Sequence, residues 1–186
     1  MRVIAGSLKG RRLKPPAWEG LRPTSDKLRG TLFNILASRI AGARVVDAYA
    51  GTGAMGIEAI SRGASAVTFI ERDVRAQALI AENLARCGIA TGYTIVGFDA
   101  VRAFESLGQA GRFDIVLLDP PYALGDNENV EMKRTLAAAG ALLATDGLLI
   151  LEHARRIPPP DAAGRLARSR DVVSGDSALT FYEVRR

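Results

Sequence analysis

VVDAYAGTGAMG, residues 45–56, is the stretch that decides the fold of this chain. It begins as an apolar strand and ends in a turn in which Gly51, Gly53 and Gly56 follow the pattern G-x-G-x-x-G. Glycine lets the backbone pass close to a ligand, and this pattern is typical of the turn after the first strand of a Rossmann-like sheet. The stretch therefore predicts a strand, a ligand-binding turn and a helix.

Strand and helix patterns alternate along the rest of the chain. Strands are expected at 45–49, 66–71, 93–98, 113–118 and 148–152, and helices at 55–61, 74–86, 100–107 and 130–144. This alternation predicts an α/β fold with a mostly parallel sheet and helices on both faces. Two further strands, at 166–173 and 178–184 around Gly175-Asp176-Ser177, are expected to form a C-terminal antiparallel hairpin and to complete a seven-stranded sheet.

Four acidic residues end four successive strands: Asp47, Glu71, Asp99 and Asp119. The C-terminal ends of parallel strands meet at one edge of a sheet, where open α/β sheets bind ligands. For any one of these residues the alternative is a helix N-cap, for which Asp is favoured. Four of them in this order, together with the glycine turn, predict a ligand site at that edge.

The glycine pattern alone suits NAD and S-adenosylmethionine about equally, and Asp47 distinguishes between these two cofactors. A pyrophosphate would be repelled by this carboxylate, whereas a methionine ammonium or sulfonium would be attracted to it. Glu71 lies 20 residues after Gly51, where an acid binds two ribose hydroxyls, and Asp99 suits the adenine amino group. We therefore expect S-adenosylmethionine. We assign to its site Asp47, Ala48, Gly51, Gly53, Glu71, Arg72, Asp99 and Ala100.

Asp119-Pro120-Pro121-Tyr122 follows the apolar strand expected at 113–118. Both prolines lack an N–H, and Pro121 favours an extended conformation at Pro120, so the loop is stiff. It presents a carboxylate, carbonyls and an aromatic ring, which suit the N–H groups and the face of a base with an exocyclic amine. An ordinary turn is the alternative, because short motifs give false positives. We assign all four residues as catalytic.

The net charge of +5 is concentrated at the N-terminus. Residues 1–30 contain eight Lys and Arg and two acids, a net +6, whereas the other 156 residues contain 17 basic and 18 acidic side chains, a net −1. Such a cluster is typical of a segment that binds a polyanion, and a solvated basic tail is the alternative. We expect a basic arm or small hairpin at 1–30 and a catalytic domain at 31–186. The residues assigned to this polyanion are Lys9, Arg11, Arg12, Lys14, Arg22 and Arg29.

The overall composition fits one globular domain, with 48% hydrophobic residues in a chain of 186. The single cysteine, Cys87, excludes an internal disulfide and a cysteine-based zinc site, and we assign no metal. No signal peptide and no apolar stretch of membrane-spanning length is recognisable, so the protein is expected in the cytoplasm, away from membranes.

Together, these motifs resemble class I S-adenosylmethionine-dependent methyltransferases that act on exocyclic amines. The end motifs narrow the match to the bacterial RsmD family, the 16S ribosomal RNA guanine-N2 methyltransferases, and the resemblance covers essentially the full length. These motifs are RVIAG (2–6), GRRL (10–13), LRPT (21–24), TLFNIL (31–36) and GDSALTFY (175–182). One departure is Gly30, where the family has Glu; Asp26 or Glu19 could supply the missing acid.

The resemblance implies methyl transfer from S-adenosylmethionine to N2 of a guanine in 16S ribosomal RNA, within the small ribosomal subunit or an assembly intermediate. It also implies that the basic residues of the N-terminal arm bind this RNA. We expect the protein to be a monomer. We hypothesise that Asp119 and the Pro120 carbonyl accept the two N–H groups of the amine while Tyr122 stacks on the base. DNA or RNA adenine-N6 methylation is the alternative that this loop does not exclude. A non-catalytic RNA-binding assembly factor is another. An NAD-dependent oxidoreductase is disfavoured by Asp47 and by the lack of an acid–base residue, since His153 is expected to be a surface or packing residue.

Overall fold

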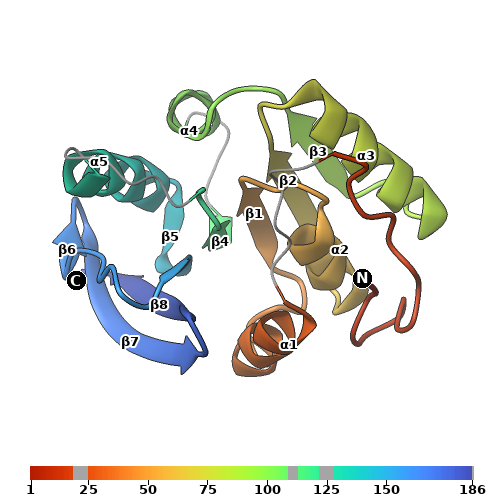
Figure 1. Cartoon of the computed structure of the whole chain (residues 1–186). Coiled ribbons are helices and arrows are strands. Elements are labelled where there is room, and N and C mark those ends of the chain that lie inside the picture. Colours follow the sequence, from red (N-terminus) through yellow and green to blue (C-terminus); the bar gives the residue numbers. More distant parts are fainter. Residues whose placement is uncertain (19–24, 109–112, 122–127, 186) are drawn as a thin grey trace.

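The computed structural model describes residues 1–18, 25–108, 113–121 and 128–185, which form one mixed sheet of eight strands with helices on both faces (Figure 1). The strands are β1 (Arg44–Ala48), β2 (Ala66–Ile70), β3 (Tyr93–Val96), β4 (Phe113–Leu118), β5 (Leu143–Ala154), β6 (Ala162–Ala163), β7 (Leu166–Ser174) and β8 (Ser177–Val184). The helices are α1 (Asp26–Ile35), α2 (Ala54–Ser61), α3 (Val74–Arg86), α4 (Ala100–Leu107) and α5 (Glu128–Ala141). The expected Rossmann-like fold is confirmed. No helix within these ranges is long and apolar enough to cross a membrane.

The order of the strands places a ligand site in the middle of the sheet. It is β3-β2-β1-β4-β5-β8-β7-β6, in which the first five strands are parallel and the last three are antiparallel additions. The chain builds outward from β1 to β2 and β3, and then returns to add β4 on the other side of β1. This reversal is the topological switch point at which open α/β sheets bind their ligands.

The C-terminal part of the sheet is larger than the sequence indicates. β5 begins at Leu143, where it pairs with Phe113, and continues after a register shift to Ala154. The hairpin of β7 and β8 forms as expected. β6 pairs with β7 and adds an eighth strand of two residues to the seven that were predicted.

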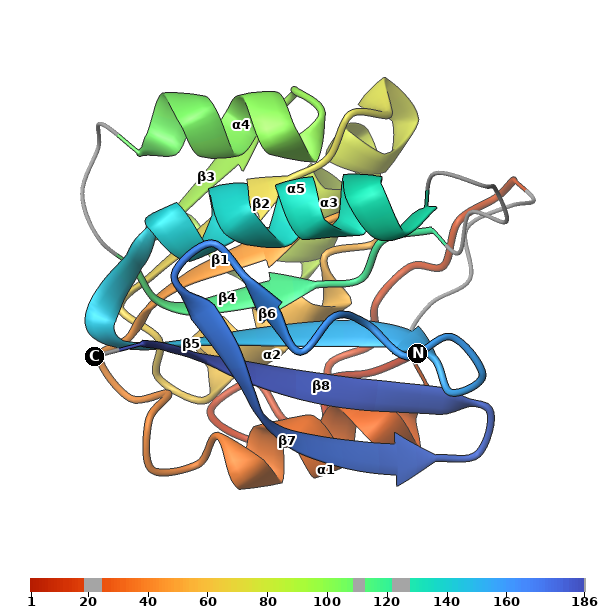
Figure 2. The same cartoon turned by 90° about the vertical axis from the view of Figure 1, so that its left-hand side faces the viewer.

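Two apolar clusters, one on each face of the sheet, form the core. Helices α1, α2 and α3 pack on one face through residues such as Leu32, Ile57 and Ile80. Helices α4 and α5 cover the other face through Phe104 and Leu136, and Figure 2 shows these two helices lying together above the sheet. Because both faces are covered, the parallel strands are continuous apolar runs.

Residues 1–18 are docked on the domain. Arg2 and Arg12 form an antiparallel bridge, so the segment folds back as a small hairpin. The side chains of Val3 and Leu13 are buried in the cluster beneath α1 and α2. The basic segment expected at the N-terminus is therefore tied to the core by its apolar residues.

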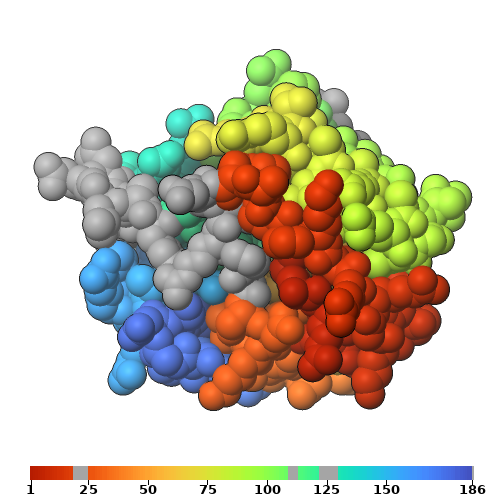
Figure 3. All heavy atoms as spheres, turned by 45° about the vertical axis from the view of Figure 1, so that its right-hand side comes forward, coloured from red at the N-terminus to blue at the C-terminus, as the bar shows by residue number. Residues whose placement is uncertain are grey.

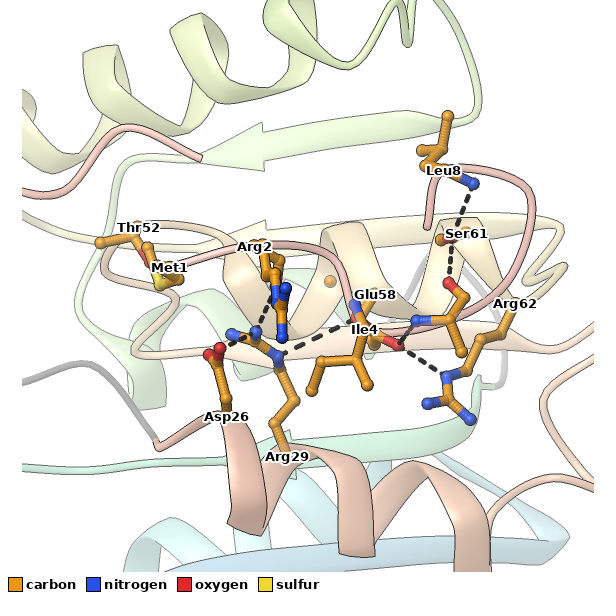
Figure 4. A network of polar contacts seen from close by, with 12 residues as sticks. Met1, Arg2, Ile4, Leu8, Asp26, Arg29, Thr52, Glu58, Ser61 and Arg62 are labelled. Atoms are coloured by element: carbon orange, nitrogen blue, oxygen red, sulfur yellow. Dashed lines mark hydrogen bonds and ion pairs between the residues drawn. The ribbon is translucent and has the colours of Figure 1, made fainter. Parts of the chain in front are cut away.

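Glu58 of α2 fastens this hairpin to the domain, as Figure 4 shows. Its buried carboxylate accepts the backbone N–H of Ile4 at 2.7 Å and of Ala5 at 3.0 Å, and an N–H of Arg62 at 2.7 Å. A charge can be buried at acceptable cost only when it has such partners. Helix α2 and the N-terminal segment therefore hold each other in place.

Arg29 corrects one prediction. It was assigned to RNA, but its side chain is fully buried under the N-terminal segment (Figure 4). It donates to the Arg2 carbonyl and to Asp26, the latter at 2.9 Å, and its Nε lies 3.9 Å from Glu58. Burial lowers the pKa of this guanidinium, although Asp26 and Glu58 act in the opposite direction. Arg29 is a structural link between α1, α2 and the hairpin, and it cannot contact a phosphate from there.

Gly30 lies inside α1, so the boundary expected at residue 30 falls within a helix. A Cβ built on Gly30 would lie 3.8 Å from the Ile4 side chain, which is an ordinary contact. Asp26, one of the two proposed replacement acids, pairs with Arg29. Glu19, the other, lies outside the described residues.

We expect Gly30→Ala to raise the free energy of unfolding by roughly 0.5–1 kcal/mol, because alanine favours the helix and restricts the unfolded chain. Gly56→Ala in α2 is the matched control, since its Cβ would lie 2.2 Å from the Phe69 ring and must force the two elements apart. Urea unfolding of the wild type and both variants measures the effect. A less stable Gly30→Ala protein would contradict the packing described for α1.

Candidate active site

A pocket lies at the C-terminal edge of β1, β4 and β5, beside the switch point of the sheet. Most of its wall is apolar, but three carboxylates, from three different strands or strand ends, also line it. The lining residues are Leu32, Asp47, Met55, Leu117, Leu118, Asp119, Ile150, Glu152 and Leu179. The acids expected at the ends of β1 and β4 are therefore neighbours in one pocket.

The turn from β1 into α2 has the unusual backbone that its glycines predict. Gly51 and Gly53 have φ angles of 53° and 75°, in the left-handed region that favours glycine. Tyr49 also has a positive φ, 61°. Such an angle is uncommon for residues other than glycine, and the exceptions cluster at functional sites. The turn is thus held in a conformation that the surrounding structure must enforce.

Asp47 supplies part of that constraint. Its buried carboxyl group accepts the backbone N–H of Gly56 at 2.7 Å, which anchors the first turn of α2 to β1. Burial and, to a lesser extent, the negative charges of Asp119 and Glu71 raise the pKa of Asp47 to about 8, against the opposing hydrogen bond from Gly56. Asp47 is therefore mostly protonated at neutral pH until a positive charge enters the pocket.

Glu71 holds the other side of the same turn. One oxygen accepts the N–H of Gly51 at 2.9 Å, and the other accepts the N–H of Asp73 at 2.9 Å. The carboxylate is thereby fixed at the end of β2, where the sequence places a ribose-binding acid. Arg72, beside it, is exposed.

Asp99 is the N-cap of α4. Helix capping is the structural role that the sequence also allowed for any one of the four acids. Its Oδ1 accepts the N–H of Arg102 at 3.1 Å, and Ala100 is buried at the start of the helix. The cap holds the Asp99 side chain at the C-terminal end of β3, on the same sheet edge as Glu71 and Asp47.

Asp119 directly follows β4, and its backbone N–H donates to the carbonyl of Ala48, at the end of β1, at 3.4 Å. This contact joins the two strand ends on either side of the switch point. Pro120 is half-buried and Pro121 is exposed. Tyr122, the fourth residue assigned as catalytic, lies outside the described residues.

The remaining residues assigned to RNA differ in their surroundings. Lys9, Arg11 and Arg12 are exposed on the N-terminal hairpin, which Figure 3 shows spread over the surface beside α3. Lys14 is also exposed, but its Nζ lies 2.6 Å from Glu82 in an ion pair. Arg22 lies outside the described residues.

Asn83 was missed by the sequence analysis and connects the hairpin to the glycine turn. This fully buried side chain accepts the N–H of Lys14 at 2.7 Å and donates to the carbonyls of Lys14 at 3.2 Å and Thr52 at 3.0 Å. A single polar residue near the C-terminal end of α3 gives no sequence signal for such a role.

Tyr49 and Glu152 were also missed as site residues. The Tyr49 hydroxyl forms a hydrogen bond with Thr135 of α5, and burial raises the pKa of this phenol. Glu152 of β5 lines the pocket and is 7% exposed. His153 points elsewhere: it is buried, with Nε2 2.9 Å from the Thr180 hydroxyl, so the expected packing role is confirmed. Among the described residues, no group of three or more His, Cys, Asp or Glu side chains could hold a metal ion.

The strand order, the glycine turn and the Asp-Pro-Pro loop define a class I methyltransferase fold. A family model described as conserved hypothetical protein 95 matches residues 1–183, and the chain belongs to this family. Its curated relatives confirm the resemblance to the RsmD family of methyltransferases. Ribosomal RNA small subunit methyltransferase D of Escherichia coli (strain K12) is 34% identical over 184 residues, which cover 98% of this chain and 89% of the relative. YlbH of Bacillus subtilis (strain 168), which carries the name of an rRNA methyltransferase, is 34% identical over the whole of both chains.

Solved structures agree with this assignment. A protein of Thermus thermophilus superposes with a TM-score of 0.83 at 32% identity, covering 99% of each chain. A structure titled as the methyltransferase yhhF of Escherichia coli has a TM-score of 0.82 at 30% identity, covering 100% of this chain and 98% of its own. The similarity therefore includes the N-terminal hairpin and the C-terminal strands as well as the central sheet.

Proposed function

We propose that this protein transfers a methyl group from S-adenosylmethionine to the exocyclic N2 amine of a guanine in small-subunit ribosomal RNA, and releases S-adenosylhomocysteine. The observation that carries the proposal is that Asp119, the residue before the two prolines, lines the same pocket as Asp47 at the switch point. An amine-orienting loop then lies next to a group that attracts a cationic cofactor. The RsmD name of the E. coli relative supports the choice of RNA.

The acids at the sheet edge fit the methyl donor, which supplies an electrophilic methyl group on a sulfonium. Asp47 would bind its methionine ammonium, Glu71 its ribose hydroxyls and Asp99 its adenine amino group. A bound cation would lower the pKa of Asp47, which burial and the neighbouring acids raise to about 8, and would so favour the carboxylate that pairs with it. The proposed contacts are completed by Ala48, Gly51, Gly53, Arg72 and Ala100.

Asp119 and the Pro120 carbonyl would act on the nucleophile. The lone pair of an aromatic amine is delocalised into the ring, so the amine attacks poorly unless its geometry is changed. Two acceptors that bind its two N–H groups draw the nitrogen toward tetrahedral geometry and direct the lone pair at the methyl group. This is catalysis by positioning and electrostatics, and the proton can leave after the methyl has been transferred. Tyr122 is proposed to stack on the base.

The hairpin at the N-terminus is proposed to bind the phosphates of the RNA. Its exposed Lys9, Arg11 and Arg12 carry positive charge on a segment that Glu58 and Asn83 fix relative to the pocket. Contacts of this kind position a substrate without reading its sequence. We propose that the substrate is the small ribosomal subunit or an assembly intermediate, and that the protein acts on it as a cytoplasmic monomer.

The proposal is tested by identifying the methylated nucleoside. The protein is incubated with labelled S-adenosylmethionine and, in separate reactions, with unmodified small subunits, free ribosomal RNA and DNA. We expect N2-methylguanosine from the ribosomal substrates. N6-methyladenosine would support the alternative activity, and no transfer at all would support a binding factor without catalysis.

Asp119→Ala is expected to lower the rate of methyl transfer by at least about 100-fold, because an acceptor for the reacting amine is removed. Binding of S-adenosylmethionine, measured by calorimetry, should stay within a few-fold of the wild type. Asp114→Ala is the matched control: it removes a carboxylate from β4 that accepts the N–H of Arg44 at 2.7 Å, on a side chain exposed away from the pocket. Equal turnover in the Asp119 and Asp114 variants would refute the role given to Asp119.

Reversal of two charges on the hairpin, Arg11→Glu with Arg12→Glu, should weaken RNA binding and flatten its salt dependence. The slope of log affinity against log salt concentration should fall by roughly 0.7–0.9 for each phosphate that the variant no longer binds. Arg165→Glu with Arg185→Glu is the control, because these exposed residues lie where β7 begins and β8 ends, at the opposite edge of the sheet. Identical slopes for the two double variants would show that the hairpin does not bind phosphates.

A further inference from the structure

Glu152 is a pocket carboxylate to which the mechanism above gives no task. The register of the sheet places it beside Asp119. Leu118 of β4 pairs with Leu151 of β5, and the two acids each follow this pair by one residue. Neighbouring strands are about 4.8 Å apart, so the two acids are adjacent along the sheet edge.

The two side chains also face the same way. Leu118 and Leu151 belong to the apolar cluster on the α4 and α5 face. Successive residues of a strand alternate between faces, so Glu152 points to the other face, toward α1 and α2. Asp119, which follows the end of β4, lines the same pocket as Leu32 of α1 and Met55 of α2 and so lies on that side as well. Leu117 and Ile150, which directly precede Leu118 and Leu151, belong to the apolar cluster on that face. The pocket is lined by both of these residues and by the two acids.

This placement has a chemical consequence for the base that enters. A carboxylate only accepts hydrogen bonds. The Watson–Crick edge of guanine presents two neighbouring donors, the N1–H and the N2 amine. Adenine instead presents its N6 amine beside an N1 lone pair, which a second carboxylate would repel. Two adjacent carboxylates therefore match guanine and reject adenine.

We propose that Glu152 is a specificity-determining residue, which accepts the N1–H of the target guanine while Asp119 and Pro120 orient its N2 amine. The low exposure of Glu152, 7%, strengthens the discrimination, because a mismatched lone pair beside a buried carboxylate is poorly compensated by water. This inference rests on the proposed function. It explains how the same Asp-Pro-Pro loop can serve guanine rather than adenine.

The test compares guanine with 2-aminopurine at the methylated position of the ribosomal RNA, in small subunits reconstituted from ligated RNA. 2-Aminopurine keeps the N2 amine, but its N1 is an acceptor. The wild type should prefer guanine in kcat/KM by about 10- to 100-fold, the size of a good base-edge contact. Glu152→Gln offers an N–H to the N1 acceptor, so this preference should shrink at least ten-fold or reverse. Affinity for S-adenosylmethionine should stay within a few-fold.

Glu183→Gln is the matched control, because this glutamate is exposed on β8, the strand next to β5, and should leave the preference unchanged. An unchanged preference in Glu152→Gln, with or without weaker cofactor binding, would overturn the inference. Equal methylation of 2-aminopurine and guanine by the wild type would overturn it too. That outcome does not depend on whether a variant folds. A wild type that methylates neither base would refute the proposed function itself.

Discussion

The buried carboxyl group of Asp47 is the constraint on which the rest of the site depends. It lies in β1, inside the sheet, and accepts an N–H of the first turn of α2, that of Gly56, at 2.7 Å. A bond between a strand and the next helix fixes the turn between them, and Gly56 allows α2 to approach the Phe69 ring on β2 closely. Because Asp47 lines the pocket together with Asp119, the bond that fixes the turn also fixes one side of the pocket.

Helix α2 also fixes the position of the N-terminal hairpin. Glu58, on the same helix, binds the backbone of the N-terminal hairpin, and Asn83 of α3 joins that hairpin to the carbonyl of Thr52 in the turn. Two buried polar side chains, Glu58 and Asn83, thus connect the basic hairpin to α2 and to the glycine turn. Such groups are costly to bury unless fully paired, which gives the hairpin a defined position.

The sequence predicted the parts of the fold that follow a simple period. The apolar strands and the glycine turn were recognisable, and the placement of Asp47 and Asp119 together followed from the parallel sheet. The start of β5 at Leu143 was not predictable, because it depends on pairing with Phe113. Arg29 was misassigned for a related reason: a count of charges does not reveal that Arg2 and Glu58 bury this side chain beneath the hairpin. The same limitation hid Asn83 and Glu152, whose roles arise from contacts between distant segments.

The central claim, that a buried acid receives a cationic cofactor, is tested most directly by the protons released when S-adenosylmethionine binds. In the free protein the pKa of Asp47 is raised to about 8, so at pH 7 the group holds its proton. A bound cation lowers that pKa, so the proton leaves, and affinity rises with pH until about pH 8. Calorimetry at pH 7 in buffers of different ionisation enthalpy should therefore show release of about one proton per cofactor in the wild type and none in Asp47→Asn. No release in the wild type, or equal release in both proteins, would contradict the account.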